Sequence, residues 1–239
     1  MKTALIAVAA SFAVLAQSTP PDPAAILAAT REALGGEKKL SAVKTIVATG
    51  RTQQVRGNNL VPIEFEINVE LPDKYVRKDE IPAQESGPST AGFNGDALIQ
   101  TKAPAVKQDF ARLMIGMFAS SFGGYPLTFA YVGQGEAPQG KADVLEARGA
   151  QNFTMRIFIA QSTHLPIMLS WQAPPPPARG GQPPAAPQES RIYFADYRDV
   201  EGMKWPFRLR RALGADTVEE TTFDRFRVNA RIDAKKFQP

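Results

Sequence analysis

The chain has 239 residues, with 28 Lys and Arg against 24 Asp and Glu, one His, 20 Pro and no Cys. The absence of cysteine excludes disulfides, thiol nucleophiles, lipid attachment through Cys and Cys-based metal sites, and one histidine disfavours His-based metal clusters. Hydrophobic residues at 44% and charged residues at 22% are typical of a globular protein with a sizeable core.

The first 16 residues have the three-part pattern of a secretory signal peptide. Lys2 supplies the positive start, Ala4–Leu15 is an apolar run, and Ala16 ends a small-residue cleavage motif. The alternative, a membrane anchor, needs about 20 apolar residues, and this run is shorter and is followed at once by prolines. We therefore expect residues 1–16 to be removed on export to the periplasm and residues 17–239 to form a single domain.

Export and charge together restrict the partners. Removing the signal peptide leaves 27 basic and 24 acidic residues. This excess is too weak to indicate nucleic acid, which is also a poor partner for an exported protein. No later segment is apolar enough to span a bilayer, so we expect a soluble mature protein that makes at most transient contact with membranes.

Apolar residues at steps of three and four predict two helices. The first covers residues 23–34, with Asp22 as its cap and Gly35 at its end. The second covers residues 106–122. One side of this second helix carries six apolar side chains, those of Val106, Phe110, Leu113, Met114, Met117 and Phe118.

Most of the remaining chain has the period of two that is typical of strands. In Ile63–Leu71, five apolar residues alternate with four polar ones, which indicates an antiparallel strand with one dry face and one wet face. The Asn94-Gly95 pair predicts a tight hairpin turn. Ten or eleven short strands with short turns would form an antiparallel meander. The strands are expected near residues 43–55, 63–71, 75–81, 127–132, 142–148, 152–160, 166–172, 189–198, 203–212 and 216–228.

One segment interrupts this rhythm. Residues 173–190 contain seven prolines among 18 residues. Such a stretch has too few hydrogen-bond donors for a sheet and too little apolar bulk for a core. Because it lies between two predicted strands, we expect a long, solvated hairpin tip rather than a domain boundary.

Catalytic motifs are absent from the sequence. There is no nucleophile elbow, phosphate-binding loop or dinucleotide fingerprint. His164 is the only general base with a pKa near neutrality, and it lies in a polar turn. The acidic pairs Asp196 with Asp199 and Glu219 with Glu220 are typical of solvated faces. The sequence therefore predicts no enzyme and no cofactor or metal, and a hydrolase would need His164 or an acidic pair within a pocket.

The second helix offers a binding surface instead. A sheet of this many strands must close, split or be covered. If it curls, its inner face becomes a concave apolar surface with the second helix across the mouth. Met114 and Met117 beside Phe110 suit a surface that repacks around varied apolar guests. The alternative is that these side chains simply fill a core.

Three segments resemble the LolA-like periplasmic proteins, which are the outer-membrane lipoprotein carriers and their relatives. Tyr193–Arg210, with the sequence YFADYRDVEGMKWPFRLR, resembles the family's strand, turn and strand. Phe226–Phe237 resembles its closing strand and tail, and Leu34–Ile46 is similar to its passage from helix to first strand. The likeness spans nearly the whole mature chain as a series of short motifs.

This resemblance implies a mainly β protein, with a strongly curved, unclosed antiparallel half-barrel covered by two or three helices. It also implies a non-catalytic carrier that binds lipoprotein acyl chains or another lipid and transfers them towards the outer membrane. No ligand-contacting arginine of the family matches a single position, and the proline-rich segment departs from the family's compact hairpins. The absence of Cys argues against the membrane-anchored acceptor of that pathway.

The carrier hypothesis predicts a continuous apolar cavity between the second helix and the sheet. Its expected lipid-binding residues are Phe65, Ile67, Phe110, Leu113, Met114, Met117, Phe118, Phe153, Met155 and Ile157. Donor and acceptor proteins of the envelope would be further partners. The alternative is a sensing or docking module of the same fold, which binds a partner protein through the preordered proline-rich segment.

Overall fold

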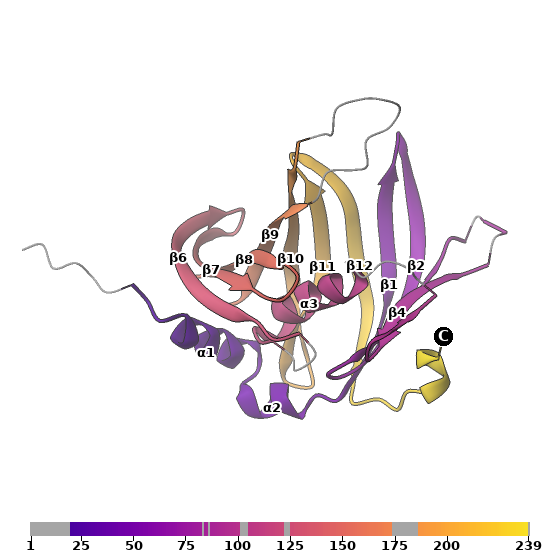
Figure 1. The fold of residues 1–239 in the computed structure, drawn as a ribbon, viewed down its shortest axis with the longest axis horizontal. Helices are drawn as coiled ribbons and strands as arrows, with labels where there is room; N and C mark the ends of the chain where they lie inside the picture. The colour runs from indigo at the N-terminus through magenta and orange to yellow at the C-terminus, as the bar shows by residue number, and fades with distance from the viewer. Residues whose placement is uncertain are drawn as a thin grey trace, which may run out of the picture.

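The computed structural model describes residues 20–82, 84–85, 87–100, 105–121, 125–173 and 186–238. In these residues the chain forms a 12-stranded antiparallel sheet that does not close, together with three α-helices (Figure 1). The predicted signal peptide and the centre of the proline-rich segment lie outside the described residues. The open antiparallel sheet and its helices confirm the fold class predicted from the sequence.

The helices are α1 (Pro23–Leu34), α2 (Glu37–Ala42) and α3 (Ala105–Phe118), with a short 3-10 helix, η1 (Ala234–Phe237), near the end of the chain. Two of them, α1 and α3, correspond to the predicted helices, whereas α2 and the 3-10 helix were not predicted from the apolar spacing. The strands are β1 (Thr45–Arg56), β2 (Asn59–Glu70), β3 (Lys74–Glu80), β4 (Ser89–Asn94), β5 (Ala97–Ile99), β6 (Thr128–Ala137), β7 (Gly140–Arg148), β8 (Thr154–Ala160), β9 (Pro166–Ala173), β10 (Gln188–Val200), β11 (Met203–Leu213) and β12 (Asp216–Val228).

The strands form two runs rather than the single meander that the sequence suggested. The order across the sheet is β5-β4-β3-β2-β1-β12-β11-β10-β9-β8-β7-β6, and β12 joins the runs by pairing with β1, where Ile46 lies opposite Val228. The sheet has 12 strands rather than the predicted ten or eleven because β4 and β5 form a short hairpin at Asn94-Gly95. Gly95 has the positive φ of 56° that this turn requires.

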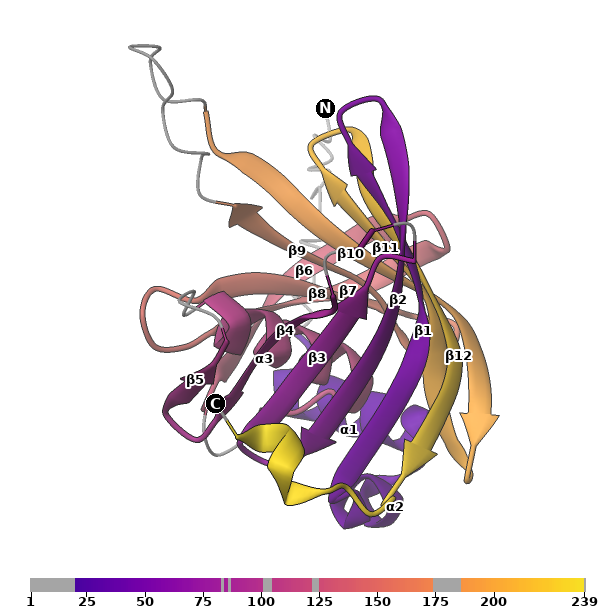
Figure 2. The same ribbon diagram turned by 90° about the vertical axis from the view of Figure 1, so that its right-hand side faces the viewer.

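Helix α3 connects the two edges of the sheet. Strands β5 and β6 are those edges, and α3 lies between them in the chain and crosses the concave face (Figures 1 and 2). The helix ends at Phe118, so the predicted end at residue 122 is wrong. Ala119 adopts a φ of 48°, and Arg31 of α1 donates a hydrogen bond to the Phe118 carbonyl at 2.8 Å. Apolar spacing alone does not reveal this stop.

Close packing holds α3 against the sheet. Gly116 faces the ring of Phe194 on β10, and a Cβ at this position would lie 2.2 Å from the ring's Cζ atom. Because glycine has no Cβ, the helix backbone rests directly on the aromatic ring. The absence of a side chain at Gly116 therefore determines how deeply α3 enters the concave face.

The main core is rich in aromatic side chains from the inner face of the sheet. Phe226 of β12 stacks on Trp205 of β11 with ring centroids 5.0 Å apart, and Trp205 meets Phe118 of α3 edge to face at 5.7 Å. On the outer face, Phe237 of η1 is buried against Val76 and its neighbours. This cover explains why the outer face of β2 is less wet than its alternation predicts.

Candidate functional site

Helix α3 packs into two hydrophobic clusters, one on each side. Its residues Phe110, Met114, Met117 and Phe118 share a cluster with Phe65 and Ile67. Its residues Ala111 and Ile115 share the other cluster with Phe153, Met155 and Ile157. The structure thus brings all the predicted lipid-binding residues around α3, but it places the last three on the opposite side of the helix from the methionines.

Side chains of the protein fill the space where the helix and the sheet meet. Met114 is 1% exposed, Phe118 is 2% exposed, and of the ten predicted residues only Leu113 is half-buried rather than buried. The expected continuous apolar cavity is therefore interrupted by α3 itself. The open volume lies beside the helix, in two separate pockets.

The larger pocket, called the inner pocket below, has a volume of about 390 Å³. It lies between α3 and the strands around β1, and its lining includes Ile67 and Leu113 from the predicted set. Its other apolar lining residues are Ile63, Ala91, Ala105, Val106, Ile192, Leu209 and Phe223. Its charged lining residues are Arg56, Arg77, Asp79, Asp109, Arg211 and Glu219.

The charged half of the inner pocket follows from the sequence of the long strands. On β12 the inward positions pass from Phe223 through Thr221 to Glu219, and on β1 they pass from Ala48 through Thr52 to Gln54. These residues were not among the predicted site residues because the expected cavity was apolar. The signal that marks them is the change from apolar to polar residues at inward positions near the strand ends.

Hydrogen bonds order the polar wall of the inner pocket. Arg77 Nε donates to Asp79 Oδ1 at 2.7 Å, and Arg77 Nη2 donates to the Thr52 hydroxyl at 3.3 Å. The Thr52 and Thr221 hydroxyls lie 2.9 Å apart across β1 and β12. Burial raises the pKa of the neighbouring Tyr75 to about 12. These hydrogen bonds therefore order a wall that contains both charged side chains and neutral hydroxyl groups.

Arg112 of α3 is a buried charge behind this pocket. Its Nη1 donates to Asp109 at 2.9 Å, and its guanidinium lies 4.3 Å from the ring centroid of Trp171 and 5.1 Å from that of Phe153. Burial lowers its pKa from the ordinary value. Cation–π contacts of this kind stabilise a desolvated guanidinium, so Arg112 attaches α3 to β9.

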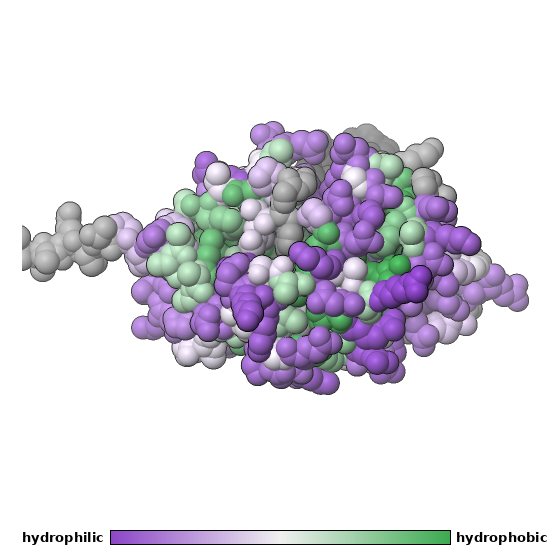
Figure 3. Space-filling view, turned by 90° about the horizontal axis from the view of Figure 1, so that it is seen from below, coloured by the Kyte–Doolittle hydropathy of each residue, from purple (hydrophilic) through white to green (hydrophobic). Residues whose placement is uncertain are grey.

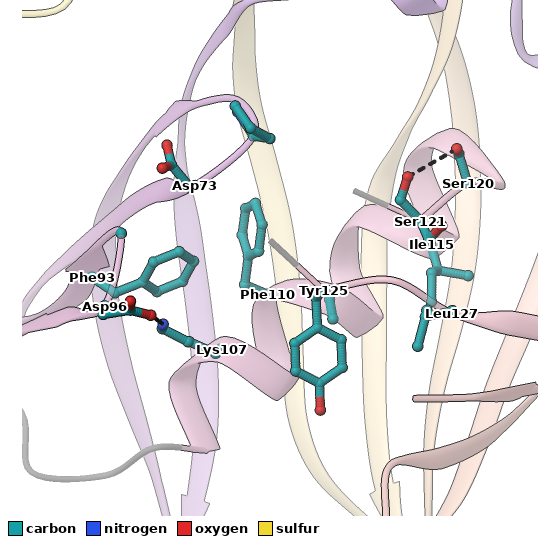
Figure 4. Close-up of a pocket in the computed structure, with 13 residues that line it drawn as sticks. Asp73, Phe93, Asp96, Lys107, Phe110, Ile115, Ser120, Ser121, Tyr125 and Leu127 are labelled. Atoms are coloured by element: carbon teal, nitrogen blue, oxygen red, sulfur yellow. Dashed lines mark hydrogen bonds and ion pairs between the residues drawn. The ribbon is translucent and has the colours of Figure 1, made fainter. Parts of the chain in front are cut away.

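The smaller pocket, called the outer pocket below, has a volume of about 230 Å³ and shares no lining residue with the inner pocket. Figure 4 shows its side chains, with Phe93 and Phe110 on one flank and Ile115 and Leu127 on the other. Lys107 and Asp96 form an ion pair of 3.0 Å at its edge. Helix α3 therefore separates two pockets, each of which has apolar side chains in its lining.

The candidate catalytic groups do not form a site. His164 is exposed in the turn between β8 and β9, so a hydrolase built on it has no enclosing pocket. Asp196 is ion-paired with Arg198. Glu219 faces the inner pocket, whereas Glu220, the next residue along β12, is exposed. Among the described residues, no three His, Asp or Glu side chains gather as a metal would require.

One face of the described part is largely hydrophilic. The face seen in Figure 3 shows hydrophobic residues as small patches between polar ones. Within the same residues, none of the helices combines the length and the apolar character needed to cross a membrane.

The geometry defines a class of protein, in which a curved, unclosed sheet holds a helix and two pockets in its concave face. No protein-family model matches the sequence. No curated protein matches it either.

Solved structures share this fold. An outer-membrane lipoprotein-sorting protein domain from Vibrio parahaemolyticus superposes with a TM-score of 0.56 at 10% identity, covering 90% of this chain and 97% of its own. A LolA superfamily protein from Nitrosomonas europaea gives 0.55 at 12% identity, with 89% and 96% covered. A DUF1329 family protein from Desulfovibrio piger gives 0.53 at 8% identity, with 91% and 98% covered. The chain thus has a LolA-like fold, as the sequence resemblance implied.

Proposed function

We propose that this protein is a non-catalytic periplasmic carrier that binds lipoprotein acyl chains or another lipid between the curved sheet and α3, for transfer towards the outer membrane. The observation that carries the proposal is the position of α3. It joins the two free edges of the sheet, crosses the concave face, and has a pocket with apolar lining on each side. A shift of this one helix would connect the two pockets into a longer apolar channel.

The side chains between α3 and the sheet suit such a shift. Met114 and Met117 are unbranched and polarizable, so they can repack against a guest without a fixed geometry. A buried acyl chain contributes roughly 0.8 kcal/mol per CH₂. Several methylenes therefore offset the apolar contacts that α3 loses when it moves. The ten predicted lipid-binding residues remain our candidates for contact with the chain, and no reactive side chain is required.

Export is the second part of the proposal. The signal-peptide pattern of residues 1–16 would deliver the carrier to the periplasm, where lipid must cross an aqueous compartment. The amino-terminal sequence of protein isolated from the periplasmic fraction tests this part. It is expected to begin at Gln17, and a mature chain that retains residues 1–16 would contradict export by cleavage.

Lipid uptake tests the carrier itself. Delipidated protein titrated with a fluorescent fatty acid is expected to show saturable uptake, and mass spectrometry of the protein as isolated should detect a co-purified lipid. Leu113→Trp would fill the inner pocket and weaken uptake. Leu60→Trp makes the same exchange at a position that is 65% exposed near the tip of the β1–β2 hairpin, and it should have no effect. Absence of saturable uptake in the wild type would refute the carrier proposal.

The docking alternative stays a prediction, since residues 174–185 of the proline-rich segment lie outside the described residues. The strands on either side pair with each other, with Ala173 opposite Gln188. Deleting residues 174–187 separates the two hypotheses. A carrier keeps lipid uptake after the deletion, whereas a docking module loses its partner.

A further inference from the structure

Some of the charged side chains that line the inner pocket form ion pairs and others do not. Arg77 and Asp79 pair with each other, and Asp109 pairs with Arg112 from behind the wall. Arg211 of β11 lines the same pocket and is half-buried. Among the described residues, no carboxylate oxygen lies within 4.0 Å of its guanidinium. Arg211 is therefore an unpaired positive charge that faces a pocket.

The acid that lies opposite Arg211 on the neighbouring strand forms no ion pair with it. Glu219 lies directly opposite it across β11 and β12, but the two side chains form no ion pair, and Glu219 instead accepts a long hydrogen bond of 3.5 Å from Thr221. Arg112 of α3, whose buried Nε has no acceptor among the described residues, does not line the pocket. An anion in the pocket would therefore pair with the Arg211 guanidinium in a partly desolvated setting, where charge-assisted hydrogen bonds are strongest.

The floor of the pocket beside Arg211 is apolar. Leu209 lies two residues before Arg211 on the same face of β11, and Leu113 and Phe223 complete the floor. The volume of about 390 Å³ is at the small end of the roughly 300–1,000 Å³ range of small-molecule sites. Such a pocket has room for one chain beside a polar group, and it is small for several acyl chains at once.

We infer that the inner pocket binds a single-chain amphiphile with an anionic head, a carboxylate or a phosphate, whose head pairs with Arg211 and whose chain lies along Leu209, Leu113 and Phe223. This inference rests on the proposed carrier function and names the ligand class of the same site. The anionic group selects the ligand, and the apolar floor supplies most of the binding free energy.

The test compares ligands that share one chain. Laurate, dodecyl phosphate and dodecanol are titrated into the delipidated full-length protein, with acetate and inorganic phosphate as the anions without a chain. Laurate or dodecyl phosphate should bind about 10- to 100-fold more tightly than dodecanol, which is the effect of one charge-assisted hydrogen-bonded pair. Whichever of the two binds more tightly identifies the head group. Acetate and inorganic phosphate should bind too weakly to compete.

Neighbouring arginines on β11 provide the matched variants. Arg211→Gln should weaken laurate binding to the level of dodecanol and leave dodecanol unchanged. Arg210→Gln alters the residue that lies outside, over the Tyr193 ring at 4.2 Å, and should change neither. Arg211→Lys should restore part of the preference for laurate.

Each contrary result identifies which claim fails. Equal binding of laurate, dodecyl phosphate and dodecanol by the wild type would overturn the anionic-head inference and leave the carrier proposal standing. Acetate or inorganic phosphate that binds as tightly as laurate would overturn the single-chain amphiphile. Absence of binding by every chain-bearing ligand would refute the carrier proposal as well.

Discussion

The contact between Gly116 and Phe194 gives a direct test of how α3 is seated. In Gly116→Ala, the new Cβ would lie 2.2 Å from Phe194 Cζ and 2.6 Å from Cε1. Optimal carbon–carbon separation is about 3.5–4.0 Å, so the helix or the ring must move by more than about one ångström. Overpacking of this kind costs about 1–3 kcal/mol. The helical preference of Ala over Gly returns about 1 kcal/mol.

We therefore expect Gly116→Ala to lower the free energy of unfolding by about 0–2 kcal/mol, measured by urea denaturation. Phe194→Leu removes the clashing edge of the ring. In that background, Gly116→Ala should be neutral or stabilising by about 1 kcal/mol, so the two substitutions should couple by about 1–3 kcal/mol. If Gly116→Ala has the same effect in both backgrounds, α3 does not rest on Phe194 as described.

The same variant bears on the carrier proposal. If α3 is the element that moves aside, a helix displaced from the sheet should admit a fluorescent fatty acid faster than the wild type does. The rate of uptake under stopped flow measures this. An unchanged or slower rate in Gly116→Ala, with the coupling to Phe194 confirmed, would mean that lipid enters without a movement of α3.

Three further predictions concern stability. Arg31→Ala removes the donor to the Phe118 carbonyl and should lower the free energy of unfolding by about 1–3 kcal/mol in urea denaturation. Arg31→Lys should recover part of this loss of stability. An unchanged midpoint for Arg31→Ala would contradict a stabilising role for the hydrogen bond at the end of α3. The hydrogen bond from Lys236 holds the pKa of Glu66 below its usual 4.5, so this contribution is present above that pH and is lost as the pH falls. Glu66→Gln should cost about 0.5–1 kcal/mol at neutral pH and nothing in acid, and a cost that persists in acid would contradict the assignment. Burial raises the pKa of Tyr75 to about 12, so stability should fall as the pH rises from 10, where the unfolded phenol ionises. Tyr75→Phe should flatten that fall, and an equally steep loss in the variant would refute burial as its cause.

Local signals in the sequence located most elements. The predicted helix at residues 23–34 and the predicted strand at residues 216–228 have the same bounds in the structure. Caps, glycine stops and the period of apolar residues act within a few positions, so they can be read without knowledge of the fold. The end of α3 was missed because the backbone turns at Ala119, after a Phe118 carbonyl that accepts a hydrogen bond from Arg31, 87 positions earlier in the chain.

The sequence by itself determined the antiparallel β architecture with its helices, and its resemblance to the LolA-like proteins implied the curvature. Strand alternation places adjacent residues such as Arg210 and Arg211 on opposite faces. Only the tertiary structure decided which of them faces inward. That choice depends on pairing between distant parts of the chain, such as β1 with β12, and on the close approach of Gly116 to Phe194. Alternation sets the spacing of side chains along a strand, whereas the packing of distant elements decides which face is enclosed and which side chains share a pocket.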